Sequence, residues 1–338
     1  MTSLAIQTAF LGDVVLTTPL LRVLAQRHGP VDVVTTPAAA PLLAHHPAVR
    51  TVIPYDKRGT DAGMRGLLTL ARRLRGAHYE VAYVPHRSLR SALLARLAGV
   101  PRRVGYADGW PFFYTERRTR PGGGHEVDRL LALADAPDAD RRPSLAVTDA
   151  EEASAARALA EGGLSGAFVA LAPGSIWGTK RWPGFPALAA RLAGAGDGIV
   201  VIGGPEDRTL GAEIARAVAG AAPRGAVVNA CGTLSLRESA AVIARARVLV
   251  TNDSAPLHLA QAMGTPTVAL FGPTVPAFGF APLNPGDAAL GVEGLACRPC
   301  SPHGPARCPL GHHRCMTALP VEQVLAAIEE TGAIHRRG

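Results

Sequence analysis

The sequence has 338 residues, of which 48% are hydrophobic and 18% charged, a composition that indicates a folded globular protein and excludes a disordered chain. This length favours two domains. No apolar run reaches the roughly 20 residues of a membrane-spanning helix, and no basic stretch precedes the first apolar run. We therefore expect a cytoplasmic protein without a signal peptide.

The formal net charge of +8 is unevenly distributed. Residues 1–150 contain 20 Lys+Arg against 13 Asp+Glu, whereas residues 151–338 contain 15 against 14. A basic surface suits nucleic acid, anionic lipid headgroups or phosphorylated substrates, and the charge alone does not decide between them.

Short apolar runs alternate with amphipathic stretches in the first half, which predicts a parallel sheet covered by helices. The expected strands are at residues 4–10, 31–35, 51–54 and 81–84, and the expected helices at 14–27, 66–74 and 89–98. Residues 107–124 interrupt this rhythm with aromatic, arginine and glycine residues. They are either a surface loop folded onto the core, or a lid or docking surface for a bulky anionic acceptor.

The alternation of strands and helices resumes after residue 144, which predicts two domains, 1–145 and 146–338. Expected helices are at residues 149–160, 185–193, 206–219, 236–245, 255–263 and 321–330, and expected strands at 168–172, 199–203, 227–229, 247–251 and 266–271.

The stretch 251–273 contains a strand-to-helix junction at Asn252, Asp253 and Ser254. In an α/β sheet such junctions lie at the carboxyl edge, where ligands bind and the first helix N–H groups carry about +0.5 charge. Asp and Ser are also common helix caps, so capping is the alternative interpretation. His258, one turn after Ser254, could contact the same ligand, although a histidine packed in the core is more common.

Three further stretches follow predicted strands. Gly12-Asp13 offers a carboxylate that could act as a general base or as a helix cap, and the helix N-terminus should keep it ionised. The loop 172–183 contains Ser175, Thr179, Lys180 and Arg181, which suit a diphosphate unless the loop is simply solvated. Glu206, in Gly-Gly-Pro-Glu-Asp, could bind a ribose diol or cap a helix.

Four of the five cysteines lie between residues 297 and 315, with three histidines among them. In a cytoplasmic chain this clustering suggests a structural metal or reduced thiols more than disulfides, although the spacing matches no common zinc pattern. The candidate ligands are Cys297, Cys300, Cys308 and Cys315.

Taken together, Gly12-Asp13, the loop 173–183, and Thr251–Ser254 with His258 and Phe271-Gly-Pro273 resemble glycosyltransferase family 9, the lipopolysaccharide heptosyltransferases. The cysteine-rich segment is similar to that of the heptosyltransferase II branch. The resemblance implies a GT-B fold, in which two Rossmann-like domains face each other across a cleft. It also implies an N-terminal domain that binds the acceptor and a C-terminal domain that binds the donor.

The resemblance implies an inverting transfer of heptose from ADP-L-glycero-D-manno-heptose to the inner core of lipopolysaccharide, with an acceptor of the heptosyl-Kdo-lipid A type. Asp13 corresponds to the general base and Lys180 to the diphosphate-binding lysine. Asp253, Ser254, Ala255 and His258 correspond to the donor loop, and Glu206 to a ribose-binding residue. No metal cofactor is implied, because the Asp-x-Asp motif of metal-dependent glycosyltransferases is missing from the pattern. Ser254-Ala255-Pro256 departs from the family's glycine-containing version.

The basic first half agrees with a phosphorylated, membrane-borne acceptor, so we expect peripheral attachment to the anionic inner leaflet and no nucleic-acid partner. A family member using another nucleotide sugar, and a non-catalytic protein that binds RNA or membranes, remain alternatives. A dehydrogenase is a third, although the Gly-x-Gly-x-x-Gly motif is missing.

Overall fold

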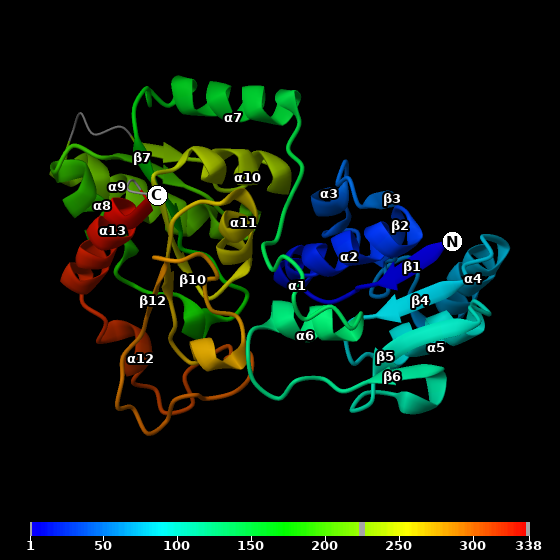
Figure 1. The fold of residues 1–338 in the computed structure, drawn as a ribbon. Helices are drawn as coiled ribbons and strands as arrows, with labels where there is room; N and C mark the ends of the chain where they lie inside the picture. Colours follow the sequence, from blue (N-terminus) through cyan, green and yellow to red (C-terminus); the bar gives the residue numbers. More distant parts are fainter. Residues whose placement is uncertain (1, 223–226, 336–338) are drawn as a thin grey trace. The chain divides into compact units, whose positions relative to one another are not determined.

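The computed structural model describes residues 2–222 and 227–335, and the chain divides into two compact units, residues 1–146 and 147–338. Each unit contains one six-stranded sheet flanked by helices (Figure 1). Every pair of neighbouring strands described in these sheets is parallel. None of the described helices combines the length and the apolar character needed to cross a bilayer.

Unit 1 has the strand order β3-β2-β1-β4-β5-β6. Its strands are β1 (Ser3–Ile6), β2 (Val31–Thr35), β3 (Val49–Pro54), β4 (Val81–Val84), β5 (Arg102–Tyr106) and β6 (Glu116–Arg118). Its helices are α1 (Leu11–Leu16), α2 (Thr18–His28), α3 (Ala40–Leu43), α4 (Gly63–Gly76), α5 (Leu89–Leu97), α6 (Glu126–Leu133) and the 3-10 turn η1 (Pro111–Phe113).

Two predictions for unit 1 were wrong. The expected helix 14–27 is divided into α1 and α2, because Pro19 fits the first turn of a new helix but cannot donate the N–H that a continuous helix requires. The expected loop 107–124 contains η1 and the edge strand β6, whose sequence Glu-Arg-Arg offers no apolar alternation. Charged residues are common on edge strands, and they hide the strand from a hydrophobic pattern.

Unit 2 has the strand order β12-β11-β10-β7-β8-β9. Its strands are β7 (Phe168–Ala172), β8 (Gly198–Val201), β9 (Val227–Asn229), β10 (Val248–Asn252), β11 (Thr267–Leu270) and β12 (Ala288–Leu290). Its helices are α7 (Asp149–Glu161), α8 (Phe185–Gly194), α9 (Arg208–Ala221), α10 (Leu236–Arg245), α11 (Ala255–Met263), α12 (Arg314–Thr317) and α13 (Val321–His335), with the 3-10 turns η2 (Gly178–Lys180), η3 (Pro205–Asp207) and η4 (Pro276–Phe278).

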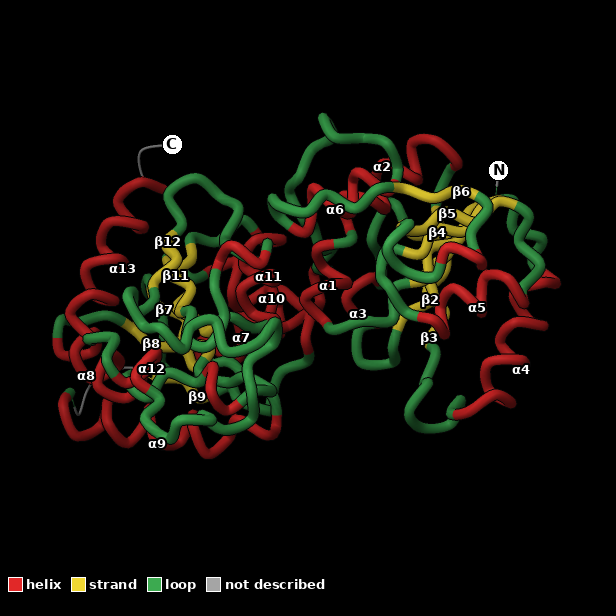
Figure 2. The backbone as a smooth tube through the Cα atoms, turned by 90° about the horizontal axis from the view of Figure 1, so that it is seen from below, coloured by secondary structure: helices red, strands yellow, loops and turns green. Residues whose placement is uncertain are grey.

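The cores form where apolar strands meet amphipathic helices, and Figure 2 shows helices beside the strands of each sheet. In unit 1, Leu4 and Ile6 of β1 pack with Leu70 of α4. In unit 2, Val169 of β7 packs with Leu188 of α8.

Both units therefore share one topology, in which the first and fourth strands are neighbours at the centre of the sheet. Strand order reverses between β1 and β4 in unit 1, and between β7 and β10 in unit 2. In doubly wound sheets, ligands bind beyond the carboxyl ends of the strands at this switch point. The fold thus indicates one candidate site in each unit.

Candidate functional site

The predicted loops 173–183 and 252–254 meet at the switch point of unit 2, because Ala172 of β7 lies beside Thr251 of β10 in the parallel register. Asn252 joins the two loops. Its side-chain Oδ1 accepts from Trp182 N at 3.1 Å, and its Nδ2 donates to Pro173 O at 2.8 Å. Asn252 is fully buried, so these bonds fix where both loops leave the sheet.

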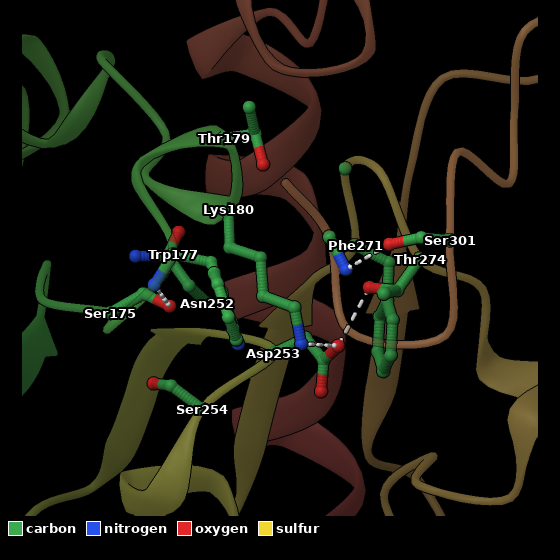
Figure 3. A network of polar contacts seen from close by, with 12 residues as sticks. Ser175, Trp177, Thr179, Lys180, Asn252, Asp253, Ser254, Phe271, Thr274 and Ser301 are labelled. Atoms are coloured by element: carbon green, nitrogen blue, oxygen red, sulfur yellow. Dashed lines mark hydrogen bonds and ion pairs between the residues drawn. The ribbon is translucent and has the colours of Figure 1, made fainter. Parts of the chain in front are cut away.

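An ion pair at this position connects two predicted site residues (Figure 3). Lys180 Nζ lies 2.6 Å from Asp253 Oδ2, and the same oxygen accepts from Thr274 Oγ1 at 2.6 Å. Both side chains of the pair are only 11% exposed. The pair therefore holds an ammonium group, which has three donor hydrogens, beside the start of α11.

Helix capping does not explain Asp253 and Ser254. The Asp253 carboxylate is bound by Lys180 and Thr274, and Ser254 occupies the N-cap position of α11 without making a side-chain capping bond. Ser254 Oγ lies 3.5 Å from Thr251 Oγ1. Ala255 is the first residue of α11, where N–H groups have no partner within a helix. The capping interpretation is thus wrong for both side chains.

His258 is buried in α11, where its Nδ1 lies 3.0 Å from Gln261 Oε1 and its ring meets Phe280 edge-on with centroids 6.1 Å apart. Burial lowers the pKa of His258, and Asp253 and Lys180 also influence this pKa, in opposite directions. The imidazole is therefore neutral and already has partners, as in the core interpretation of this residue.

The three other predicted site residues of the loop 173–183 make hydrogen bonds within the protein. Ser175 Oγ accepts from Trp177 N at 3.3 Å, and Arg181 Nε donates to Ser175 O at 2.9 Å. Thr179 is buried, and its hydroxyl donates to Pro305 O in the cysteine-rich segment. The Thr179 hydroxyl is consequently engaged within the protein.

The Gly-Gly-Pro-Glu-Asp turn lies at the end of β8. Asp207 Oδ2 accepts from Gly204 N at 3.1 Å, so Asp207 caps the turn, whereas Glu206 is exposed. A Cβ atom at Gly174 would lie 2.2 Å from Asp207 Oδ2, which requires glycine where the loop 173–183 passes this turn. Glu206 therefore stands beside the loop with a solvated carboxylate.

The cysteine-rich segment bonds to the loop 173–183 and to the residues that follow β11. His313 Nε2 donates to Thr179 O at 2.8 Å, and Cys300 N donates to Pro273 O at 2.8 Å. Arg298 donates to three carbonyl oxygens after β11, those of Phe271, Gly272 and Thr274, and its Nε lies 2.7 Å from Gly272 O. Sequence reasoning missed Arg298 and Thr274, because both act by contacts with residues distant in the sequence.

The four cysteines are free thiols with different surroundings. Cys315 is buried and Cys300 exposed, Cys297 Sγ lies 3.9 Å from His312 Nε2, and hydrogen bonds from backbone N–H groups, His313 first, lower the pKa of Cys308. Within residues 2–222 and 227–335, no three His, Cys, Asp or Glu side chains are arranged to hold a metal ion. A structural metal at these cysteines stays a prediction.

In unit 1, Asp13 lies beyond β1, at the third position of α1, where its carboxylate bonds to the backbone of the N-cap residue Phe10 as in a capping box. Its Oδ2 accepts from Phe10 N at 3.1 Å. Burial raises the pKa of Asp13 to about 6; the bond from Phe10 lowers it, Glu126 raises it and Arg120 lowers it. Desolvation thus outweighs the backbone bond that was expected to keep the pKa low. A carboxylate with this pKa is ionised at neutral pH and still basic enough to accept a proton.

The two charged residues that influence Asp13 belong to one buried cluster. Arg120 Nη2 lies 2.5 Å from Glu126 Oε2, which also pairs with Arg129 Nη1 at 3.0 Å. Arg120 also lies over the ring of Tyr106, with 5.8 Å from its guanidinium carbon to the ring centroid. These contacts fix a guanidinium near the candidate base.

Comparison with known proteins identifies the family of this chain. Residues 67–307 match the family model described as "Glycosyltransferase family 9 (heptosyltransferase)". The chain belongs to glycosyltransferase family 9. This family 9 enzyme is 30% identical over 298 residues to lipooligosaccharide heptosyltransferase 2 of Haemophilus influenzae, covering 82% of this chain and 85% of the relative. It is 28% identical over 308 residues to lipopolysaccharide heptosyltransferase 2 of Escherichia coli, covering 81% of this chain and 84% of that relative.

Solved structures agree with this assignment of the family 9 enzyme. The structure of E. coli ADP-heptose lps heptosyltransferase II matches with a TM-score of 0.78 at 25% identity, covering 99% of this chain and 100% of that one. A family 9 glycosyl transferase from Veillonella parvula matches in fold with a TM-score of 0.84 at 24% identity, covering 98% and 97%. The predicted GT-B fold and the predicted class of glycosyltransferase are confirmed, and the dehydrogenase and the non-catalytic binding protein are set aside.

Proposed function

We propose that this family 9 glycosyltransferase transfers heptose from ADP-L-glycero-D-manno-heptose to the inner core of lipopolysaccharide, with inversion at the anomeric carbon. The curated relatives named above are heptosyltransferases of lipopolysaccharide or lipooligosaccharide. The observation that carries the proposal is the Lys180 ammonium, held by Asp253 where β7 and β10 end and α11 begins. This cation suits the diphosphate of a nucleotide sugar.

The donor side of the reaction needs charge stabilisation. As the bond between the anomeric carbon and the diphosphate breaks, negative charge grows on the leaving ADP and oxocarbenium character grows on the sugar. Lys180 and the N-terminus of α11 would stabilise the leaving diphosphate, and Glu206 at the end of β8 is available to the ribose. Ser175, Arg181, Ser254 and Ala255 would line the donor, whereas Thr179 and His258 would hold the surrounding structure.

The acceptor side needs a base. Asp13 would take the proton of the acceptor hydroxyl while that oxygen forms its bond to the anomeric carbon, on the face opposite the departing ADP. A pKa of about 6 suits this step, because the carboxylate is ionised at neutral pH and its proton affinity is close to the operating pH. The product proton then leaves Asp13 to solvent.

Calorimetric titration of the wild type and of Lys180→Ala with ADP, UDP and NAD tests the donor. We expect ADP to bind selectively and the variant to bind it more weakly. Turnover with ADP-heptose and a lipid-free inner-core acceptor, followed by NMR of the new anomeric centre, tests the transfer and the inversion. If the enzyme turns over only another nucleotide sugar, the proposed donor is wrong. A product that retains the anomeric configuration would refute the inverting step.

We also propose that unit 1 contacts the anionic inner leaflet. Phe112 is 89% exposed and Trp110 is 40% exposed, and Arg117, which follows them in the sequence, is exposed as well. Exposed aromatic rings beside cations are suited to a bilayer interface with anionic lipid. Sedimentation with phosphatidylglycerol vesicles should retain the wild type and release Phe112→Ser. Equal sedimentation of both proteins, or equal binding to phosphatidylcholine vesicles, would contradict this attachment.

A further inference from the structure

A polar cluster occupies the switch point of unit 1 and has no role in the chemistry described above. Lys57 Nζ donates to Thr8 O at 2.6 Å and lies 3.2 Å from Thr8 Oγ1. His86 Nε2 lies 3.0 Å from Ser91 Oγ and 3.4 Å from Thr8 Oγ1. Thr8 follows β1, Lys57 follows β3 and His86 follows β4, so three strands deliver these side chains to the carboxyl edge.

Within the part of the chain that the structure describes, the positive charge in this cluster has no counter-ion. The polar contacts described for the half-buried Lys57 ammonium are with the Thr8 carbonyl and hydroxyl, and none of them is with a carboxylate. The adjacent acid is already used, because the Asp56 carboxylate accepts from Gly59 N at 2.9 Å and from Thr60 N at 3.1 Å. Burial lowers the pKa of Lys57, and Arg58 and Arg90 lower it further. Three cations therefore gather at one edge of the sheet.

The neighbouring histidine adds a neutral polar group. Burial, with a contribution from Lys57, lowers the pKa of His86 to about 4, so the imidazole is uncharged at neutral pH. Its Nδ1 is buried and has no hydrogen-bond partner in the part of the chain that the structure describes. A buried polar atom without a partner is destabilising, and a ligand or a water that bonds to it would offset that cost.

The two lysines of the chain differ in how their ammonium groups are paired. Of 35 Lys and Arg residues only Lys57 and Lys180 are lysines, and both lie at the carboxyl edge near a switch point. Lys180 is paired with a buried carboxylate, whereas Lys57 donates only to an uncharged residue. An ammonium with three donors and one neutral partner retains capacity for an oxyanion.

We propose that Lys57, Thr8 and His86 form a subsite for an oxyanion of the acceptor, either the carboxylate of an acidic sugar or a sugar phosphate. Lys57 supplies the charge, Thr8 a hydroxyl, and Arg58 and Arg90 increase the positive potential. Thr8 and Asp13 lie on the same segment after β1, so an acceptor anchored here would lie along the segment that contains the candidate base. This inference rests on the proposed function for the nature of the acceptor.

The test measures binding of lipid-free acceptors by calorimetry without donor, so that it does not depend on turnover. The probes are heptosyl-Kdo methyl glycoside, its neutral methyl ester, and the ester carrying a phosphate on the heptose. Lys57→Met should weaken binding of the anionic probe that the subsite recognises by at least tenfold, about the strength of one charge-assisted hydrogen bond, and leave the neutral ester unchanged. Weaker binding of the acid by the variant would identify the ligand group as the carboxylate, and weaker binding of the phosphorylated ester would identify it as the phosphate.

Two controls keep the result interpretable. Lys57→Gln removes the charge but keeps a donor for the Thr8 carbonyl, and it should behave as Lys57→Met does if the fold is intact. Arg72→Met removes an exposed charge from α4 and should bind every probe as the wild type does. The subsite would be overturned if the Lys57 variants bound the neutral ester and both anionic probes more weakly to the same extent. It would also be overturned if they bound both anionic probes as tightly as the wild type does. If the wild type transfers no heptose but Lys57 still governs anion binding, the proposed function fails and the subsite stands.

Discussion

Removing the Lys180 ammonium separates two contributions of the ion pair, to stability and to catalysis. Lys180 Nζ and Asp253 Oδ2 are 2.6 Å apart, and both side chains are 11% exposed. Breaking a buried pair by deleting one partner costs about 3–5 kcal/mol, because the remaining charge is desolvated. Thr274 still donates to Asp253, which places Lys180→Met at the lower end of that range. For a domain of this size, about 3 kcal/mol lowers Tm by roughly 6–12 °C.

Catalysis should suffer independently of this destabilisation. Loss of one preorganised electrostatic donor costs about 2.7–4 kcal/mol of transition-state stabilisation, so kcat should fall about 10²–10³-fold. The double variant Lys180→Met/Asp253→Asn removes both charges and should recover most of the lost Tm, because a neutral amide costs far less to bury. Its turnover should remain low, since the ammonium is still missing.

Thermal unfolding and steady-state kinetics on the same preparations check both parts. Arg247→Met is the matched control: it breaks a pair with Asp197 at 2.9 Å, before the start of β10, where the side chains are 25% and 24% exposed. It should cost less than about 1 kcal/mol and leave turnover unchanged. If Lys180→Met kept kcat/KM within about threefold of the wild type, the ammonium would have no role in the transition state. If the double variant recovered turnover together with Tm, the pair would be structural only.

Four other predictions follow from the structure. Asp13→Asn should lower kcat/KM by about 10²–10⁴-fold and abolish the acid limb of the wild-type pH profile, which should lie near pH 6; an unchanged limb would remove Asp13 as the base. Thr274→Val should raise the KM for the donor more than it lowers kcat, because it frees Asp253 without removing Lys180; an unaltered KM would contradict this. Arg237 lowers the pKa of Glu151 from 4.5 to about 2, so the pair stabilises the fold fully above pH 4.5 and loses that effect as the pH falls toward 2. The difference in Tm between the wild type and Glu151→Gln should therefore shrink between pH 4.5 and pH 2. A constant difference would refute this linkage. If the cysteine-rich segment holds a structural metal, elemental analysis of purified protein should find one bound ion, and chelation should lower Tm; metal-free protein with an unchanged Tm would support reduced thiols.

Much of unit 2 could be predicted from its sequence because its strands are buried on both faces. Runs such as Phe168–Ala172 and Val248–Asn252 are continuously apolar until the residues at which the loops begin. The sequence therefore predicted the elements on which Lys180 and Asp253 lie. Their ion pair could not be predicted, because it joins residues 73 positions apart and depends on which strands are neighbours.

The chemistry of unit 1 was harder to predict for physical reasons. Strand β5 begins with two arginines and β6 is Glu-Arg-Arg, so neither displays the apolar pattern of a buried strand. The position of Asp13 suggested a low pKa from backbone bonding, whereas the extent of its desolvation depends on the residues that cover it. Local sequence determines which groups a side chain can bond nearby, but only the packed fold determines how much water it loses.

The two lysines connect these observations. The other 33 basic residues of this chain are arginines. An arginine at either position would bring a planar fork with five donors into a space that now holds one compact ammonium. At Lys180 that fork would have to fit against Asp253, which also accepts from Thr274, and at Lys57 against the Thr8 carbonyl. The contacts at both positions therefore suit the compact charge of a lysine better than the fork of an arginine, once at the carboxyl edge of each sheet.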